Sequence, residues 1–138
     1  MQKIKCSWKD NMTFLAEDEF GHSLIMDLAE DAHGNNEGFR PMAMLLVGLG
    51  GCLGVDVKII LDKMKIGIDS LDLDIDGIMD TTKTPKTYEE IIVTFRFKGN
   101  NLEIGKLEKA INLAEKKYCN VSAILSQTCK ITHKIIVD

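Results

Sequence analysis

Four cysteines are the residues of this chain best suited to chemistry: Cys6, Cys52, Cys119 and Cys129. None of them shows Cys-x-x-Cys spacing. Cys52 stands among glycines in a long apolar run, and Cys119 follows the end of an expected helix. A free cysteine is most often a small buried hydrophobic residue, so composition alone leaves packing and catalysis both open for these two. Cys6 and Cys129 accompany predicted strands, and we expect both to pack.

Other residue types offer no comparable cluster. The three histidines are spread along the chain without metal-ligand spacing: His22, His33 and His133. Three aspartates alternate with apolar residues, which places them on the solvent face of a strand rather than in a metal site: Asp72, Asp74 and Asp76. The glycines near position 50 fit no phosphate-binding motif. The sequence therefore predicts no bound metal.

Length and charge limit the class of protein. A chain of 138 residues is long enough for one domain with its own core, and we expect a single domain over 1–138. The net charge of −4 gives no basic surplus for nucleic acid or for an anionic membrane surface. The first residues lack the apolar segment of a signal peptide, so we expect a cytoplasmic protein in a reducing compartment.

The elements that must position the cysteines are organised around one apolar helix. Pro41 suits a first helical turn, and the apolar run continues to Val57. Four glycines interrupt it, each at a cost of roughly 1 kcal/mol relative to alanine: Gly48, Gly50, Gly51 and Gly54. We interpret them as the place where another backbone approaches closely. The run is too short and too interrupted to predict a membrane span.

The other elements follow from hydrophobic periodicity. The helix above is expected over 41 to about 65, and a second helix over 103–118, followed by a helical turn at 121–125. Strands are expected at 3–9, 12–16, 22–28, 71–79, 88–97 and 130–137, with a loop at 29–39. Residues 71–97 form a long hairpin in this interpretation. The order of strands and helices predicts the α+β class.

Two stretches resemble the OsmC/Ohr family. The segment from Pro41 to Cys52 is similar to the family helix that begins with proline and ends with a cysteine, here in a Gly-Gly-Cys form. Residues 117–122, Lys-Tyr-Cys-Asn-Val-Ser, resemble the family's second cysteine motif. The resemblance covers essentially the whole chain. It implies an OsmC-like fold: an intertwined homodimer in which antiparallel sheets from both chains wrap around two central helices.

The resemblance also implies an activity. In peroxidase members the cysteine matching Cys52 attacks a peroxide, and the cysteine matching Cys119 resolves the resulting sulfenic acid as a disulfide. The expected function is therefore a thiol-dependent peroxidase acting on organic hydroperoxides or related peroxides. It needs no bound cofactor, only an external thiol or dihydrolipoyl reductant.

Two departures from the family pattern keep alternatives open. Peroxidase members stabilise the thiolate with an arginine from the N-terminal strands, whereas residues 1–39 contain none. Arg40 is the candidate substitute. Met42 stands where the family has a glutamate after the proline. The alternatives are a non-peroxidase redox or small-ligand-binding protein on the same scaffold, and a structural dimer whose cysteines only pack.

Overall fold

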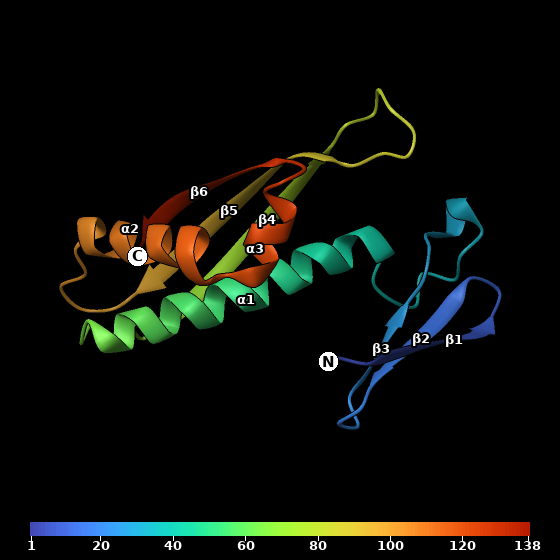
Figure 1. Ribbon diagram of the computed structural model, residues 1–138, viewed down its shortest axis with the longest axis horizontal. Coiled ribbons are helices and arrows are strands. Elements are labelled where there is room, and N and C mark those ends of the chain that lie inside the picture. Colours follow the sequence, from blue (N-terminus) through green and yellow to red (C-terminus); the bar gives the residue numbers. More distant parts are fainter. The chain divides into compact units, whose positions relative to one another are not determined.

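The computed structural model describes all 138 residues and divides the chain into two compact units, Met1–Leu45 and Leu46–Asp138 (Figure 1). With two three-stranded sheets and three α-helices, the α+β prediction is confirmed. That the whole chain forms a single domain stays a prediction.

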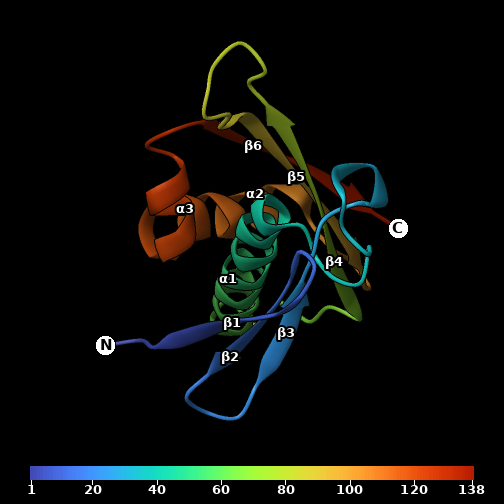
Figure 2. The same ribbon diagram turned by 90° about the vertical axis from the view of Figure 1, so that its right-hand side faces the viewer.

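The first unit is built on an antiparallel meander, visible in Figure 2. Its strands are β1 (Ile4–Asp10), β2 (Thr13–Asp18) and β3 (Ser23–Met26), paired in that order as expected. The following loop contains one short 3-10 helix, η1 (Glu30–Ala32). Cys6 lies on β1 but is exposed, so the expectation that it packs is wrong within this chain.

A buried carboxylate organises the loop after β3. Asp27 accepts hydrogen bonds from the Thr13 hydroxyl at 3.0 Å and from the backbone N–H groups of Leu28 at 2.7 Å and Glu37 at 3.2 Å. Burial acts to raise the pKa of Asp27, but these hydrogen bonds outweigh it and hold that pKa below its ordinary value. The loop that precedes the long helix is therefore fixed by a charged side chain that stays ionised.

The long helix α1 (Pro41–Lys63) begins at the predicted proline. The buried side of this helix carries Leu49, Leu53, Val57, Ile60 and Leu61. Other apolar residues of the helix stay uncovered, and only 28% of its most apolar 18-residue stretch is buried. By length and composition the helix could cross a membrane, but the core helix of a soluble protein passes the same test. Of its glycines, Gly50 and Gly54 lie on the buried side, and Gly48 and Gly51 lie on the uncovered side.

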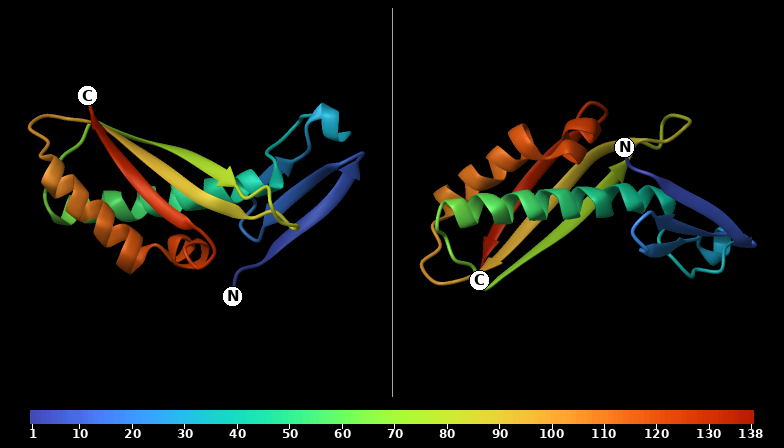
Figure 3. Two further views of the ribbon diagram at one scale, coloured as in Figure 1. Left: turned by 90° about the horizontal axis from the view of Figure 1, so that it is seen from above. Right: turned by 60° about the horizontal axis from the view of Figure 1, so that its bottom comes forward.

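The second unit contains a mixed sheet, shown in Figure 3, with β4 (Ser70–Met79), β5 (Tyr88–Lys98) and β6 (Lys130–Val137) in the order β4-β5-β6. The predicted hairpin is confirmed, because β4 and β5 are antiparallel. The sheet is not wholly antiparallel, since β6 runs parallel to β5. The helical segment between β5 and β6 brings the chain back to the end of the sheet at which β5 begins. Two parallel neighbouring strands require such a crossover connection.

One face of this sheet forms the core. Alternate residues of β5 are fully buried: Ile91, Val93, Phe95 and Phe97. They share that face with Leu73 and Ile75 of β4, which contact α1 where Gly54 and Gly50 leave room. The opposite face carries the exposed aspartates Asp72, Asp74 and Asp76, as predicted.

The expected helix over 103–118 is two segments. The α-helix α2 (Ile104–Leu113) passes into a π-helical turn, η2 (Ala114–Tyr118), and α3 (Asn120–Leu125) follows after Cys119. π-helical turns within helices are uncommon and occur often at functional sites. Here the turn ends directly before a cysteine.

Candidate functional site: a pair of thiols

The structure brings two of the predicted site residues together in the second unit. The Sγ atoms of Cys52 and Cys119 lie 2.8 Å apart. A disulfide bond is about 2.05 Å long, so the two sulfurs need to move by less than an ångström to be bonded. Cys129 is buried, as predicted, and has its own contact with the Leu125 carbonyl. The thiol pair is thus a specific juxtaposition of one helix with the segment before α3.

Local backbone structure explains the place of Cys119. Its N–H donates to the Ala114 carbonyl at 2.8 Å, which closes the π-helical turn. Its own backbone is extended, and its Sγ accepts a hydrogen bond from the Ser122 N–H at 3.3 Å as the N-cap of α3. The sulfur is therefore held at the junction of two helical segments.

The two thiols differ in their surroundings. Cys119 is 2% exposed, and burial together with the neighbouring Cys52 side chain raises its pKa to about 12. Cys52 is only partly buried. Cys119 is therefore a protonated thiol at neutral pH, and Cys52 is the more accessible sulfur of the pair.

A carboxylate stands beside Cys52. The Cys52 thiol lies 4.0 Å from Oδ2 of Asp56, one helical turn further along α1. Peroxide-reducing thiols use a nearby cation, whereas this neighbour of Cys52 is an acidic side chain. Asp56 was missed in the sequence, although its spacing of four residues from Cys52 is the spacing at which helical side chains meet.

The third predicted residue, Arg40, lies in the first unit. Its guanidinium donates to the Gly38 carbonyl at 3.0 Å and to Oδ1 of Asn36 at 2.7 Å. These bonds tie it to the loop that leads into α1. A role for Arg40 at the thiols stays a prediction.

The same cluster offers ligand atoms for a metal. One atom each from Cys52, Asp56 and Cys119 lies within 4.8 Å of the other two. Two thiolates around tetrahedral zinc stand about 3.8 Å apart, as follows from zinc–sulfur bonds of about 2.3 Å. The sulfur atoms here are 2.8 Å apart, so the arrangement fits a dithiol poised for oxidation better than a metal site.

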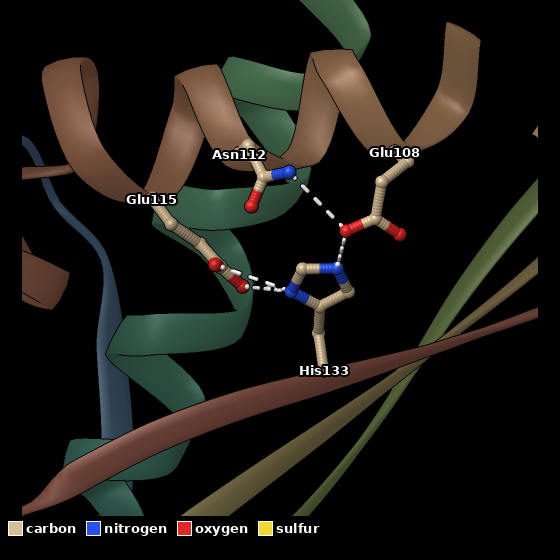
Figure 4. A network of polar contacts seen from close by, with 4 residues as sticks. All are labelled: Glu108, Asn112, Glu115 and His133. Atoms are coloured by element: carbon tan, nitrogen blue, oxygen red, sulfur yellow. Dashed lines mark hydrogen bonds and ion pairs between the residues drawn. The ribbon is translucent and has the colours of Figure 1, made fainter. Parts of the chain in front are cut away.

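A second polar cluster supports the segment before Cys119 (Figure 4). His133 of β6 contacts Glu108 through Nε2 at 2.7 Å and Glu115 through Nδ1 at 3.0 Å, and Asn112 donates to Glu108 at 3.2 Å. Burial raises the pKa of Glu115, and the facing His133 opposes that rise. The cluster links the π-helical turn to the sheet. This cluster was missed in the sequence. The spacing of Glu108 and Glu115, two helical turns apart, was the sequence signal that places both carboxylates on one side of a helix.

Two cavities lie near the thiol pair. One, of about 460 Å³, is largely polar and is lined by Glu115, Lys116, Lys117, Tyr118, Cys119, Asn120, Ser122, Ala123, Ser126 and Ile131. The other, of about 370 Å³, is largely apolar and is lined by Asp56, Ile59, Ile60, Lys63, Met64, Lys109, Leu113 and Tyr118. Tyr118 borders both. Cys119 lines the polar cavity, and the neighbour of Cys52, Asp56, lines the apolar one.

Fold and site together define an α+β protein with a vicinal pair of thiols, one accessible and one buried. The family model for "OsmC-like protein" matches residues 34–134. The chain belongs to the OsmC-like family, and the predicted OsmC/Ohr resemblance is confirmed.

Relatives support this assignment. Protein YhfA of Escherichia coli (strain K12) is 29% identical over 132 residues, which are 95% of this chain and 94% of YhfA. A hypothetical protein from Aquifex aeolicus VF5 has a TM-score of 0.82 at 29% identity, with 100% of this chain and 98% of that one covered. An organic hydroperoxide resistance protein from Elizabethkingia anophelis has a TM-score of 0.80 at 11% identity, covering 100% and 96%, and so shows the fold alone.

Proposed function

We propose that this protein is a thiol-dependent peroxidase in which Cys52 is the peroxidatic nucleophile and Cys119 the resolving thiol. The observation that carries the proposal is the 2.8 Å distance between the two sulfur atoms. Relatives of the same fold that are named for organic hydroperoxide resistance support the choice of substrate class. A cytoplasmic location, where thiol reductants are abundant, is part of the proposal.

The reaction needs two steps. The Cys52 sulfur attacks the terminal peroxide oxygen, the O–O bond breaks, and the alcohol leaves with the proton of the thiol. The Cys52 sulfenic acid then condenses with the Cys119 thiol, which forms the disulfide and releases water. Two external thiol groups, which end as a disulfide of their own, supply the two electrons that return the Cys52–Cys119 disulfide to the dithiol state.

The apolar cavity next to Asp56 supports an organic hydroperoxide as the substrate. Its apolar lining includes Ile59, Ile60, Met64 and Leu113, and a volume of about 370 Å³ lies in the range of small-molecule sites. An alkyl or aryl group in this cavity would lie beside Asp56, whose carboxylate is 4.0 Å from the Cys52 sulfur. Hydrogen peroxide has no such group, so we expect it to react more slowly.

The test is turnover with a thiol reductant. Wild-type protein should reduce cumene hydroperoxide catalytically and faster than hydrogen peroxide, and Cys52→Ser should abolish the reaction. Cys119→Ser should still consume one equivalent of peroxide per chain without turning over. Absence of peroxide consumption with every thiol reductant would overturn the proposal.

We further propose that Arg40 assists the Cys52 thiolate. Residues 1–39 contain no equivalent of the family arginine, and Arg40 is the one arginine that precedes Cys52. Arg40→Gln should then slow peroxide reduction about 10-fold or more. Lys9→Gln removes a positive charge from the first unit and serves as the control. Equal rates in both variants would remove Arg40 from the site.

A second candidate function follows from Asp56. A carboxylate stands 4.0 Å from Cys52, where peroxide-reducing thiols use a cation, and this favours a small-ligand-binding or slower redox protein on the same scaffold. This alternative requires a ligand in the apolar cavity. Thermal-shift screening of Cys52→Ser with small apolar compounds tests it, and Ile60→Asp should abolish any stabilisation found.

A homodimer is also part of the proposal. On α1, Val47, Val55 and Ile59 are 45%, 58% and 46% exposed, and a side chain added at Gly48 or Gly51 would meet nothing in this chain. Such a face suits the close approach of a second apolar helix. A partner copy of α1 would supply it, in line with the intertwined dimer that the sequence predicts.

A further inference from the structure

The cavity beside Cys119 is lined by two lysines, although the chain as a whole is acidic. Cys119 and Ser122 are buried within it, and the exposed Lys116 and Lys117 lie at its edge. Asn120 and Ser126 add further polar groups to the lining. The net charge of the whole chain is −4, so two lysines at one cavity form a local exception.

The one carboxylate in the lining, Glu115, is held by a histidine. The Glu115 carboxylate points toward His133 and lies 3.0 Å from its Nδ1 (Figure 4). Lys117 lies over the ring of Tyr118, with Nζ 5.7 Å from the ring centroid. Two lysines and one carboxylate therefore line the cavity, so the cations of its lining outnumber the anions.

We propose that this cavity is the docking site for the reductant, and that the reductant is a small thiol that carries a carboxylate or sulfonate group. The inference rests on the redox pair of the proposed function and goes beyond it by naming the reductant class. A volume of about 460 Å³ accommodates a small molecule, and the lysines supply the charge that would hold its anionic group.

The chemistry starts at Cys119, the member of the pair that lines the cavity. The thiolate of the reductant attacks Cys119 Sγ, the Cys52–Cys119 bond breaks, and Cys52 leaves as a thiolate that takes up a proton. A second reductant thiolate attacks the reductant sulfur of the mixed disulfide. Cys119 then leaves and is protonated, and the two reductant molecules end as their own disulfide. Two electrons pass from two thiols to one disulfide.

The experiment measures reduction alone, independently of peroxide. The Cys6→Ser protein is oxidised with diamide to the Cys52–Cys119 disulfide and reduced with either 2-mercaptoethanesulfonate or neutral 2-mercaptoethanol. Each rate is corrected for thiolate concentration and divided by the rate with a neutral model disulfide. We expect a preference of about 5-fold or more for the sulfonate, which shrinks at high salt.

Two double lysine variants show which part of the protein causes the preference for the sulfonate thiol. Lys116→Gln/Lys117→Gln should reduce it below about 2-fold, whereas Lys83→Gln/Lys86→Gln, with the same loss of charge in an exposed loop, should keep it. Equal rates for the two thiols, or a preference that the cavity variant retains, would overturn the inference alone. Failure to form the disulfide would overturn the redox pair as well. A charge preference without peroxide turnover would remove the peroxidase and keep the reductant site.

Discussion

At the scale of single residues, the thiol pair is asymmetric. Cys119 is buried and protonated at neutral pH, while Cys52 is partly accessible and has a carboxylate 4.0 Å away. This division matches the roles of a resolving and an attacking thiol. The Asp56 carboxylate is thus a charged group in contact with the more accessible sulfur of the pair.

The effect of the Asp56 carboxylate on the reactivity of Cys52 can be tested by the isosteric substitution Asp56→Asn. In a Cys6→Ser background, Asp56→Asn should speed the alkylation of Cys52 by neutral iodoacetamide at pH 7 by about 3- to 10-fold, because a negative charge beside the sulfur is removed. Peptide mass spectrometry identifies the modified residue. Asp62→Asn, an exposed change further along α1, should alter the rate less than about 2-fold. A slower reaction in Asp56→Asn would mean that the carboxylate assists Cys52.

The pKa of Cys119 predicts how stability depends on alkaline pH. Its thiol keeps its proton in the folded protein to about pH 12, whereas the unfolded chain loses it near the ordinary value of 9.0. The unfolded state thus binds fewer protons between these values, so this group lowers the stability of the fold as pH rises through that window. Cys119→Ser lacks the effect. Its free energy of unfolding in urea should therefore fall less steeply than that of the wild type from pH 8 to pH 10.5, and Cys6→Ser should follow the wild type.

At the scale of the elements, the π-helical turn joins the helix α2 to Cys119. His133 of β6 holds this turn through Glu115, whose carboxylate is largely buried. Breaking a buried charged contact leaves the remaining group unsatisfied, which costs more than the contact contributes when made. The His133 cluster is therefore a support for the position of Cys119.

Substitution of the histidine measures this support. We expect His133→Gln to lower the free energy of unfolding at pH 7 by about 1–3 kcal/mol and to slow disulfide formation between Cys52 and Cys119. The control is His22→Gln, because His22 also contacts a carboxylate but its side chain is 79% exposed. That change should cost less than about 0.5 kcal/mol. Equal effects of the two substitutions would contradict the supporting role.

Most elements were predictable from local patterns. The start of α1 followed from Pro41, and β4 and β5 followed from alternation and a turn between them. The parallel pairing of β6 was not predictable, because it depends on the path of the chain through α2 and α3. The approach of Cys52 to Cys119 came from the family resemblance alone, since no spacing rule joins residues so far apart. The contact of His133 with Glu115 was not predictable either, because no spacing rule joins these two residues and no family motif indicates them.

At the scale of the whole molecule, the uncovered apolar side of α1 is the main unexplained surface of a single chain. Val55 is 58% exposed on this side, next to glycines with open space beside them. Burying such a face in a dimer would remove it from water at roughly 25 cal/mol per Å² of apolar area. The proposed second copy accounts for both the glycines and the valines.

A charge on this face tests the dimer. Val55→Asp should shift the protein from a dimer, with twice the 15.4 kDa of one chain, toward the monomer in sedimentation experiments. Ile104→Asp is the matched control, since Ile104 is also 58% exposed but begins α2. A wild-type monomer, or a dimer that Val55→Asp leaves intact, would show that a different surface or none is used.

The most direct measurement for the account as a whole is a single turnover. One equivalent of cumene hydroperoxide is added to the reduced Cys6→Ser protein, the reaction is quenched with an alkylating agent, and the cysteine peptides are mapped by mass spectrometry. We expect a disulfide between Cys52 and Cys119 in nearly all chains, with an equal amount of cumyl alcohol released. Both thiols recovered in reduced form with the peroxide intact would contradict it.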